Sequence, residues 1–366
     1  MTNNNSVNLY LLLSLIFIFL TNNYFNYNET LIHGGADGFD YFNIAQNYPN
    51  FAEGSTGHHR VWRFLFPYLI GFLNYNLDID IFILFQFFTF LMLLILIFLF
   101  KYILEHFNLP KFYIFFLLCF VIYSPYFLRY YIAIPTMIND VIFINSLLLV
   151  TLGYLKSNKI LLFFGFIISA FTRQNSIVLL ITVIFLKLIF KKKSFLNFKN
   201  IFFLFLIIIT IFFINNYFAD NSTVYNDSYS LKNRFALFFG SFSLIDFIKF
   251  NLFPMVILLP IIFFIIFEKQ KFYFKNSEIF IFTLITSTLI FLIAYLNGPI
   301  FTGKNIIRLI NLVYPLIIIS LIIHIKFKIN NLIKFKTFFY LIFFIFWSFH
   351  PTFSNIKIFE FLKFLY

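Results

Sequence analysis

Long apolar stretches recur along the whole chain and constrain its fold more than any other feature. Eight of them approach the ~20 residues needed to cross the ~30 Å apolar core of a bilayer, and a shorter one follows. No backbone polar group can stay unpaired in hydrocarbon, so each stretch is expected to form a helix. They lie at residues 7–21, 80–100, 112–128, 139–155, 201–218, 252–267, 279–296, 309–325 and 337–349.

The composition agrees with lipid as the solvent of most side chains. The chain of 366 residues is 61% hydrophobic and 11% charged, whereas a soluble domain carries about 25% charged residues. The net charge of +13 could indicate a nucleic-acid partner, but the basic residues lie in short clusters between apolar stretches, as in membrane proteins. We therefore predict an all-α polytopic membrane protein, a single transmembrane domain over residues 1–366 with about 10–11 transmembrane helices, and the bilayer rather than nucleic acid as partner.

The lysines predict an orientation. With the N-terminus in the cytoplasm, fifteen lysines fall on the cytoplasmic side against three acidic residues. Cytoplasmic loops carry an excess of basic residues, so we expect this orientation, in the inner membrane of a bacterium. The lysines concerned are Lys101, Lys111, Lys156, Lys159, Lys191, Lys192, Lys193, Lys199, Lys269, Lys271, Lys275, Lys326, Lys328, Lys334 and Lys336.

With this orientation, some segments cannot cross the membrane as a single helix. Residues 61–76 are apolar enough for a span, but this orientation requires them to lie as a helix along the outer membrane surface. Residues 22–79 become an outer loop with juxtamembrane helices, and residues 219–250 a second outer loop. Residues 160–190 have lysines at both ends and Arg173 in the middle, so we expect a hairpin of two short helices.

Arginine is distributed differently from lysine. None of the six arginines falls in a predicted cytoplasmic loop: Arg60, Arg63, Arg129, Arg173, Arg234 and Arg308. A guanidinium binds phosphate oxygens in pairs and stays charged when partly buried, so this bias predicts a phosphate-bearing ligand on the outer side. The alternative is that the arginines only reach out to lipid headgroups.

The first outer loop collects acidic and histidine side chains beside the membrane. Asp37 and Asp40 lie in it, followed by Glu53, His58 and His59. A carboxylate placed there can accept the proton of a sugar or lipid hydroxyl, although the aspartates could equally cap a helix. Adjacent histidines point in divergent directions and lack further partners at metal-ligand spacing. We therefore assign no metal site and no cofactor, and the sequence offers no support for a divalent metal.

Residues 37–45 read Asp-Gly-Phe-Asp-Tyr-Phe-Asn-Ile-Ala, which resembles the Asp-Glu-x-x-Tyr-x-x-Ile-Ala stretch in the first outer loop of GT-C membrane glycosyltransferases. Residues 63–73 are similar to the family's juxtamembrane helix, residues 170–175 to its short-helix pair, and residues 308–315 to a late Arg-to-Pro span. Enzymes of this family move a sugar from a polyprenyl-phosphate donor. The resemblance implies a GT-C-like fold with Asp37 as the catalytic aspartate. Gly38 replaces the family's Glu, which weakens an acidic metal-binding pair.

Two further ionisable residues have alternative interpretations. Asp140 lies at the outer end of a predicted span, where such residues are costly and often functional. It either contacts the substrate or forms a structural ion pair with Arg129. Lys304 precedes Arg308 in a loop containing Gly303, and it either reaches a donor phosphate or stays solvated.

These residues predict a membrane glycosyltransferase that moves a sugar from a polyprenyl-phosphate donor to a glycan, lipid or protein acceptor on the non-cytoplasmic side. Asp37 or Asp40 would act as the general base. The donor phosphate would be bound by Arg63, Arg129, Arg173, Lys304 and Arg308. Other substrate contacts would come from Tyr41, His58, His59, Arg60 and Asp140.

Two other functions remain as alternatives. An outer-leaflet polysaccharide polymerase or ligase would use the same arginines on a pyrophosphate-linked glycan. A transporter or flippase of lipid-linked glycans would need ionisable groups at the membrane midplane and usually an internal repeat. The ionisable groups gather instead near the outer edge of the predicted spans, and no repeat is visible in the sequence.

Overall fold

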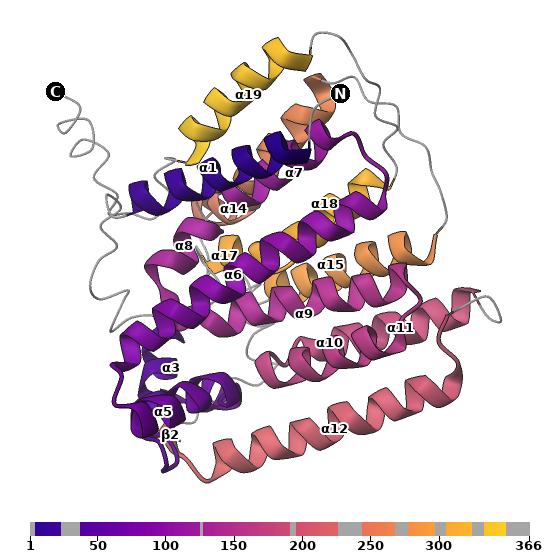
Figure 1. The fold of residues 1–366 in the computed structure, drawn as a ribbon. Helices are drawn as coiled ribbons and strands as arrows, with labels where there is room; N and C mark the ends of the chain where they lie inside the picture. The colour runs from indigo at the N-terminus through magenta and orange to yellow at the C-terminus, as the bar shows by residue number, and fades with distance from the viewer. Residues whose placement is uncertain are drawn as a thin grey trace, which may run out of the picture.

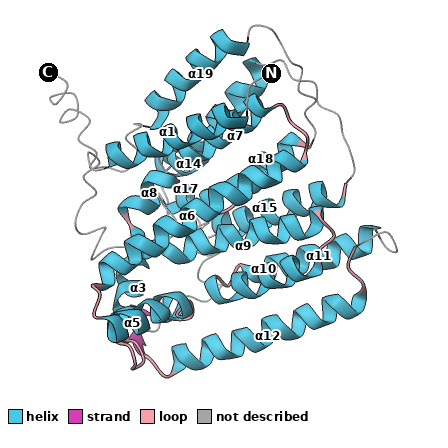
Figure 2. Cartoon of the chain, viewed as in Figure 1, coloured by secondary structure: helices cyan, strands magenta, loops and turns pink. Residues whose placement is uncertain are grey.

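The computed structural model describes residues 4–22, 37–124, 127–190, 195–225, 244–267, 277–296, 305–323 and 333–348. These residues are predominantly helical, as Figures 1 and 2 show. In chain order the helices are α1 (Asn4–Asn22), α3 (Asp37–Gln46), α4 (His58–Val61), α5 (Leu65–Leu77), α6 (Ile81–His106), α7 (Lys111–Ile122), α8 (Leu128–Ala133), the 3-10 helix η1 (Pro135–Met137), α9 (Ile138–Leu155), α10 (Lys159–Thr172), α11 (Ser176–Phe190), α12 (Phe198–Asp220), α14 (Leu244–Phe267), α15 (Glu278–Leu296), α17 (Asn305–Asn311), α18 (Tyr314–Ile322) and α19 (Ile333–Ser348).

Each apolar stretch of the sequence contains a helix. The stretch 309–325 is divided, because α17 ends at Asn311 and α18 begins at Tyr314. The stretch 112–128 ends early as a helix, since α7 stops at Ile122 and α8 begins only at Leu128. Neither stretch therefore forms one uninterrupted helix over its full predicted length.

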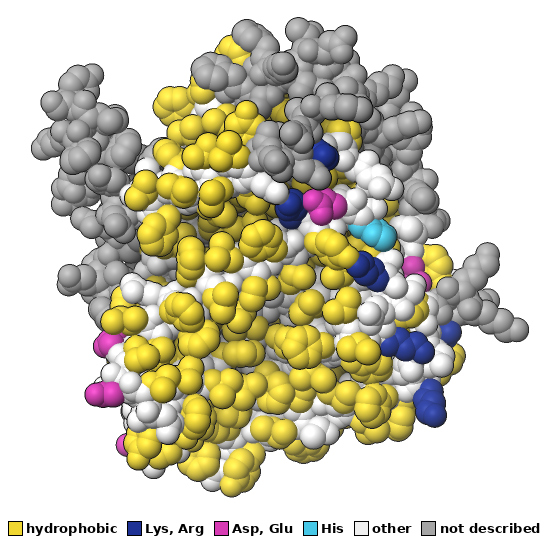
Figure 3. All heavy atoms as spheres, viewed as in Figure 1, with side chains coloured by type: hydrophobic (Ala, Val, Ile, Leu, Met, Phe, Trp, Pro, Cys, Tyr) yellow, Lys and Arg dark blue, Asp and Glu magenta, His cyan; other side chains and the backbone are white. Residues whose placement is uncertain are grey.

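Within the described residues, three helical segments are long and apolar enough to cross a membrane: Ile81–His106, Pro135–Leu155 and Phe198–Asp220. Figure 3 shows apolar side chains over most of one face, with basic side chains gathered toward one side of it. On α12, for example, Phe202 and Phe213 are 61% and 72% exposed. Such a surface is costly in water and favourable in lipid. The chain is therefore an all-α membrane protein, while the total number of crossings stays a prediction.

Helix α9 lies at the centre of the described structure, between α6 on one side and α10 on the other (Figure 1). Two glycines let α9 and α10 approach closely. A Cβ atom at Gly153 would lie 2.8 Å from the Leu162 Cβ, and one at Gly165 would lie 2.9 Å from the Ser146 carbonyl oxygen. Small residues allow this kind of close helix packing in membranes. These contacts hold α9 and α10 closely together.

The stretch 160–190 forms two helices, α10 and α11, with a break at residues 173–175. Asn158 caps α10, because its side chain accepts hydrogen bonds from the amides of Ile160 and Leu161. Helix α10 ends at Thr172, and the backbone of the next residue, Arg173, is extended. With 14 residues at about 1.5 Å each, α10 is too short to cross the bilayer core alone. The break therefore places Arg173 inside the helical assembly.

Two short strands depart from the predicted all-helical architecture. Strand β1 (Glu53–Gly57) precedes α4, and β2 (Thr223–Tyr225) follows α12. They pair in parallel and join the segment between α3 and α4 to the end of α12. The Trp62 indole also donates a 2.7 Å hydrogen bond to the Asn216 side chain. The second half of the first predicted outer loop thus contacts the end of α12 and the beginning of the second predicted outer loop, which the sequence pattern did not indicate.

Helix α5 covers the stretch that the sequence placed on the membrane surface. It packs on α3, where a Cβ atom at Gly71 would lie 2.2 Å from the Ala45 carbonyl oxygen. Pro67 and Ile70 are buried, whereas Leu69 and Phe72 are 46% and 43% exposed. Figure 1 shows α3, α5 and β2 together at one end of the long helices. This end carries the candidate site.

Candidate functional site

Three aspartates and four arginines form one group of ion pairs around the first turn of α3. We call this group the arginine–aspartate cluster; it consists of Asp37, Asp40, Asp140, Arg60, Arg63, Arg173 and Arg308. Its members come from α3, from α4 and the residues after it, from the first turn of α9, from the α10–α11 break and from α17. Four guanidinium groups face three carboxylates, so the cluster has one positive charge in excess.

Asp140 is the innermost member of the cluster and is fully buried. Its Oδ1 accepts hydrogen bonds from Arg173 Nε at 3.0 Å and Nη2 at 2.6 Å. Its Oδ2 accepts a hydrogen bond from Arg308 Nε at 2.6 Å. Buried charges are tolerated when they are paired in this way. Asp140 therefore sets the positions of two arginines from two different parts of the chain.

Asp37 is the most accessible carboxylate of the cluster, with 18% of its side chain exposed, against 4% for Asp40 and 0% for Asp140. Arg308 Nη2 lies 2.8 Å from its Oδ2, and Arg60 Nε lies 2.9 Å from its Oδ1. Arg63 Nη1 approaches Oδ2 at 3.7 Å. Arg308 thus bridges Asp37 and Asp140.

These contacts determine the ionisation of Asp37. Burial disfavours the carboxylate, but the positive charges of Arg308, Arg63 and Arg60 outweigh burial and hold the pKa of Asp37 well below its usual range. Asp37 is therefore ionised throughout the physiological pH range. As it stands it is a weak proton acceptor, because a base this acidic gains little by taking up a proton.

Arg63 is held on several sides and is 9% exposed. Its Nη1 donates a 2.8 Å hydrogen bond to the Tyr41 hydroxyl, and its Nη2 a 3.3 Å hydrogen bond to the Gln174 side chain. The Asn139 amide donates to its backbone carbonyl at 3.0 Å. Within the described part of the chain, its buried Nε has no hydrogen-bond acceptor. That donor is available to a ligand.

Arg60 connects the two aspartates of α3, because it pairs with Asp40 as well as with Asp37. Asp40 is 3% exposed, and the ion pair covers one of its oxygens. Of the two aspartates that the sequence marked as catalytic candidates, Asp37 is the one with access to the surface.

Other predicted site residues lie away from the cluster. The expected ion pair between Asp140 and Arg129 is wrong: both Asp140 oxygens bind Arg173 and Arg308, and Arg129 Nη2 donates to Thr21 at 2.8 Å and to Ser348 at 3.3 Å. The sequence placed both residues near one end of the spans but could not show which helices face each other.

The predicted histidines lie at the edge of the site. His58 Nε2 lies 3.0 Å from Asp220 Oδ1, in a partly exposed pair. The backbone carbonyl of His59 accepts a 3.2 Å hydrogen bond from Gln174, a residue that sequence reasoning had not assigned to the site. Lys304 and Arg234 lie outside the described residues. Among the residues the structure describes, no group of three or more His, Cys, Asp or Glu could hold a metal ion.

The packing of α3 explains why glycine follows Asp37. A Cβ atom at Gly38 would lie 2.3 Å from the Thr136 hydroxyl of η1, so a glutamate there requires the two elements to separate. The close contact brings Asp37 over the first turn of α9. No family model, curated protein or solved structure matches this chain.

Proposed function

We propose that the chain is a membrane glycosyltransferase that moves a sugar from a polyprenyl-phosphate donor to an acceptor hydroxyl on the non-cytoplasmic side. The observation that carries the proposal is the pairing of Arg308 with the accessible carboxylate of Asp37, in a cluster with an excess of guanidinium groups. Such a cluster can bind a phosphate and offers a base beside it.

The excess charge of the cluster favours one class of donor. A sugar linked to a polyprenyl phosphate is a phosphodiester with one negative charge, whereas a pyrophosphate-linked glycan carries two. The described cluster has one positive charge beyond what its aspartates balance. Burying more negative charge than a site can pair is costly. This supports the monophosphate donor over the pyrophosphate donor that a polymerase or ligase would use.

Donor binding also supplies a way to activate Asp37. A phosphate beside Arg308 and Arg63 would attract the same guanidinium groups that now hold Asp37 as an anion. Sharing them weakens the stabilisation of the carboxylate and raises its pKa toward the ordinary carboxyl value. Asp37 then becomes a better base only when the donor is present, so proton acceptance is coupled to donor binding.

The reaction is a single displacement. The acceptor oxygen forms a bond to C1 of the sugar, the bond between C1 and the phosphate oxygen breaks, and the acceptor proton passes to Asp37. The departing polyprenyl phosphate gains a negative charge, which the arginines stabilise. Because no covalent sugar–enzyme intermediate forms, the configuration at C1 is inverted. Asp140, with both oxygens engaged, acts as a positioning residue for Arg173 and Arg308.

Asp37→Asn is the direct test. The purified protein in liposomes would be supplied with radiolabelled polyprenyl-phosphate sugars and a mixture of lipid and glycan acceptors. Asp37→Asn should lower transfer by a factor of about 10² to 10⁴, the usual contribution of a general base. The matched control is Asp78→Asn, at an exposed position with φ of 53°, which asparagine also adopts readily.

Three results would contradict the proposal. One is full activity of Asp37→Asn. Another is retention of the C1 configuration in the product. The third is transfer from pyrophosphate-linked glycans only, which would assign the site to a polymerase or ligase.

A further inference from the structure

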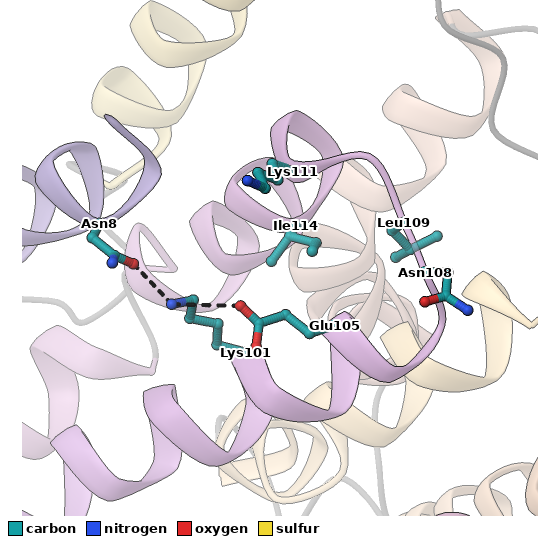
Figure 4. Close-up of a pocket in the computed structure, with 7 residues that line it drawn as sticks. All are labelled: Asn8, Lys101, Glu105, Asn108, Leu109, Lys111 and Ile114. Carbon is teal, nitrogen blue, oxygen red and sulfur yellow. Dashed lines mark hydrogen bonds and ion pairs between the residues drawn. The ribbon is translucent and has the colours of Figure 1, made fainter. Parts of the chain in front are cut away.

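A cavity of about 530 Å³ lies at the opposite end of α6 from the arginine–aspartate cluster. It is bounded by α1, by the last turns of α6 and by the start of α7, and Figure 4 shows side chains from all three in one space. Its polar lining consists of Asn8, Lys101, Glu105, Asn108 and Lys111, and its apolar lining of Leu109 and Ile114.

The cavity combines positive charge with hydrogen-bonding groups. Lys101 Nζ donates a 2.8 Å hydrogen bond to the Asn8 side chain and lies 3.6 Å from Glu105 Oε1 (Figure 4). Lys111 begins α7, and no side chain caps that helix. The uncapped end of a helix attracts anions. Two lysines outweigh one glutamate, so the cavity favours an anion, while Glu105 and the asparagines can bind hydroxyl groups.

Neighbouring residues mark this level as a membrane–water interface. Lys156 hydrogen bonds the Tyr102 hydroxyl and lies 4.2 Å above the centre of its ring. Tyr102 and Tyr10 are 43% and 54% exposed. Exposed tyrosines beside lysines are typical of the interfacial belt of membrane proteins.

Apolar surface continues from the cavity toward the bilayer core. On α1, Leu12 and Leu13 are 55% and 52% exposed, and on α6 Phe98 is 59% exposed. A molecule with its anionic head in the cavity would therefore have room for acyl chains along α1 and α6. A soluble phosphate would use only the polar part of this arrangement.

We propose that this cavity binds the headgroup of an anionic phospholipid that also carries hydroxyl groups, as phosphatidylglycerol does. Lys101 and Lys111 bind the phosphate, and Glu105 with the asparagines binds the hydroxyls. The chains lie on the exposed faces of α1 and α6. This binding site is separate from the proposed transfer reaction and does not depend on it.

The test uses the full chain in detergent and native mass spectrometry with added lipid. Phosphatidylglycerol should bind more tightly than phosphatidylcholine, and the double variant Lys101→Gln, Lys111→Gln should lose about tenfold or more of that affinity, because it removes both charged donors. Lys159→Gln with Lys199→Gln is the matched control, since both lysines are exposed on other elements and their loss should leave the affinity unchanged.

Lys101→Arg with Lys111→Arg keeps both charges and should retain binding, and thermal unfolding in phosphatidylcholine identifies any variant that no longer folds. Equal affinity for the two lipids would overturn the proposal. Equal weakening by the control pair would show that only general surface charge matters, and overturn it as well. Displacement of the lipid by glycerol phosphate at equal concentration would assign the cavity to a soluble anion instead.

Discussion

Arg308 links the two parts of the cluster that differ most in exposure. One of its nitrogens binds the fully buried Asp140, and another binds the partly exposed Asp37. A planar guanidinium reaches both because its donors are arranged in a fixed fork, whereas an ammonium group is a single point charge. The side chain therefore matters for its geometry as well as its charge.

We expect Arg308→Lys to raise the KM for the donor by about tenfold or more, since one ammonium cannot replace two charge-assisted hydrogen bonds to separate carboxylates. The assay is transfer from a polyprenyl-phosphate sugar over a range of donor concentrations. Lys187→Arg, in a lipid-facing helix, is the control for a lysine–arginine exchange outside the cluster and should leave the KM unchanged. Unchanged kinetics in Arg308→Lys would show that the bridge is not needed.

The low pKa of Asp37 predicts how stability depends on pH. A carboxyl group whose pKa is lowered by folding stabilises the protein fully above its unfolded pKa of about 4. That contribution is lost progressively as the pH falls from the unfolded pKa to the lower, folded pKa. The difference in thermal stability between the wild type and Asp37→Asn should therefore be constant from pH 7 to about pH 5 and shrink below about pH 4. A difference that fades between pH 7 and 5 would contradict the assigned contacts.

At the scale of elements, the break between α10 and α11 determines what Arg173 can bind. In a continuous helix over residues 160–190 the backbone of Arg173 would be helical. Instead α10 ends at Thr172, the backbone of Arg173 is extended, and its side chain binds Asp140. The position depends on the close packing of α9 and α10 at Gly165.

Gly165→Leu should separate these two helices. Its side chain would start 2.7 Å from Val150 Cγ2 and 2.9 Å from the Ser146 carbonyl, and overpacking of this kind costs about 1–3 kcal/mol of stability. Thermal unfolding in detergent would show a lower Tm, together with weaker transfer. Phe164→Leu is the neighbouring control, because Phe164 is 54% exposed. Equal Tm values for the two variants would mean that the close contact is not formed.

At the scale of the whole molecule, two groups of charged residues lie at opposite ends of the long helices. The arginine–aspartate cluster lies at the end formed by α3, α5 and the start of α9, and Lys101, Lys111 and Lys156 lie toward the other. If the positive-inside rule holds, the lysine end faces the cytoplasm. The cluster would then open to the opposite side, where the proposed reaction takes place.

Cysteine labelling can test this orientation in intact cells. The native Cys119 is buried, so it should not react. A membrane-impermeant maleimide should label Asn50→Cys before the cells are opened and Lys111→Cys only afterwards, since both positions are exposed but lie at opposite ends. The reverse pattern would place the cluster in the cytoplasm and exclude an outer-leaflet donor.

Much of the local structure follows from residue type alone. The apolar stretches form helices because each apolar side chain is more stable in lipid and each backbone amide there must be hydrogen bonded. Both effects depend on the individual residue, so they can be read from the sequence. The break after Thr172 falls at a group of four consecutive polar residues inside an apolar stretch, residues 172–175. The polar Asn139 next to Asp140 was a similar signal, but nothing in the sequence indicated that it would bind the Arg63 carbonyl.

The sequence by itself therefore determined a helical membrane protein and a set of arginines distributed differently from its lysines. Only the tertiary structure decided that Arg308 joins Asp37, a residue 271 positions away, and that Arg129 lies instead against Thr21 and Ser348. The physical reason is that burial depends on the side chain itself, whereas an ion pair depends on which helices pack together, and packing is a property of the whole assembly.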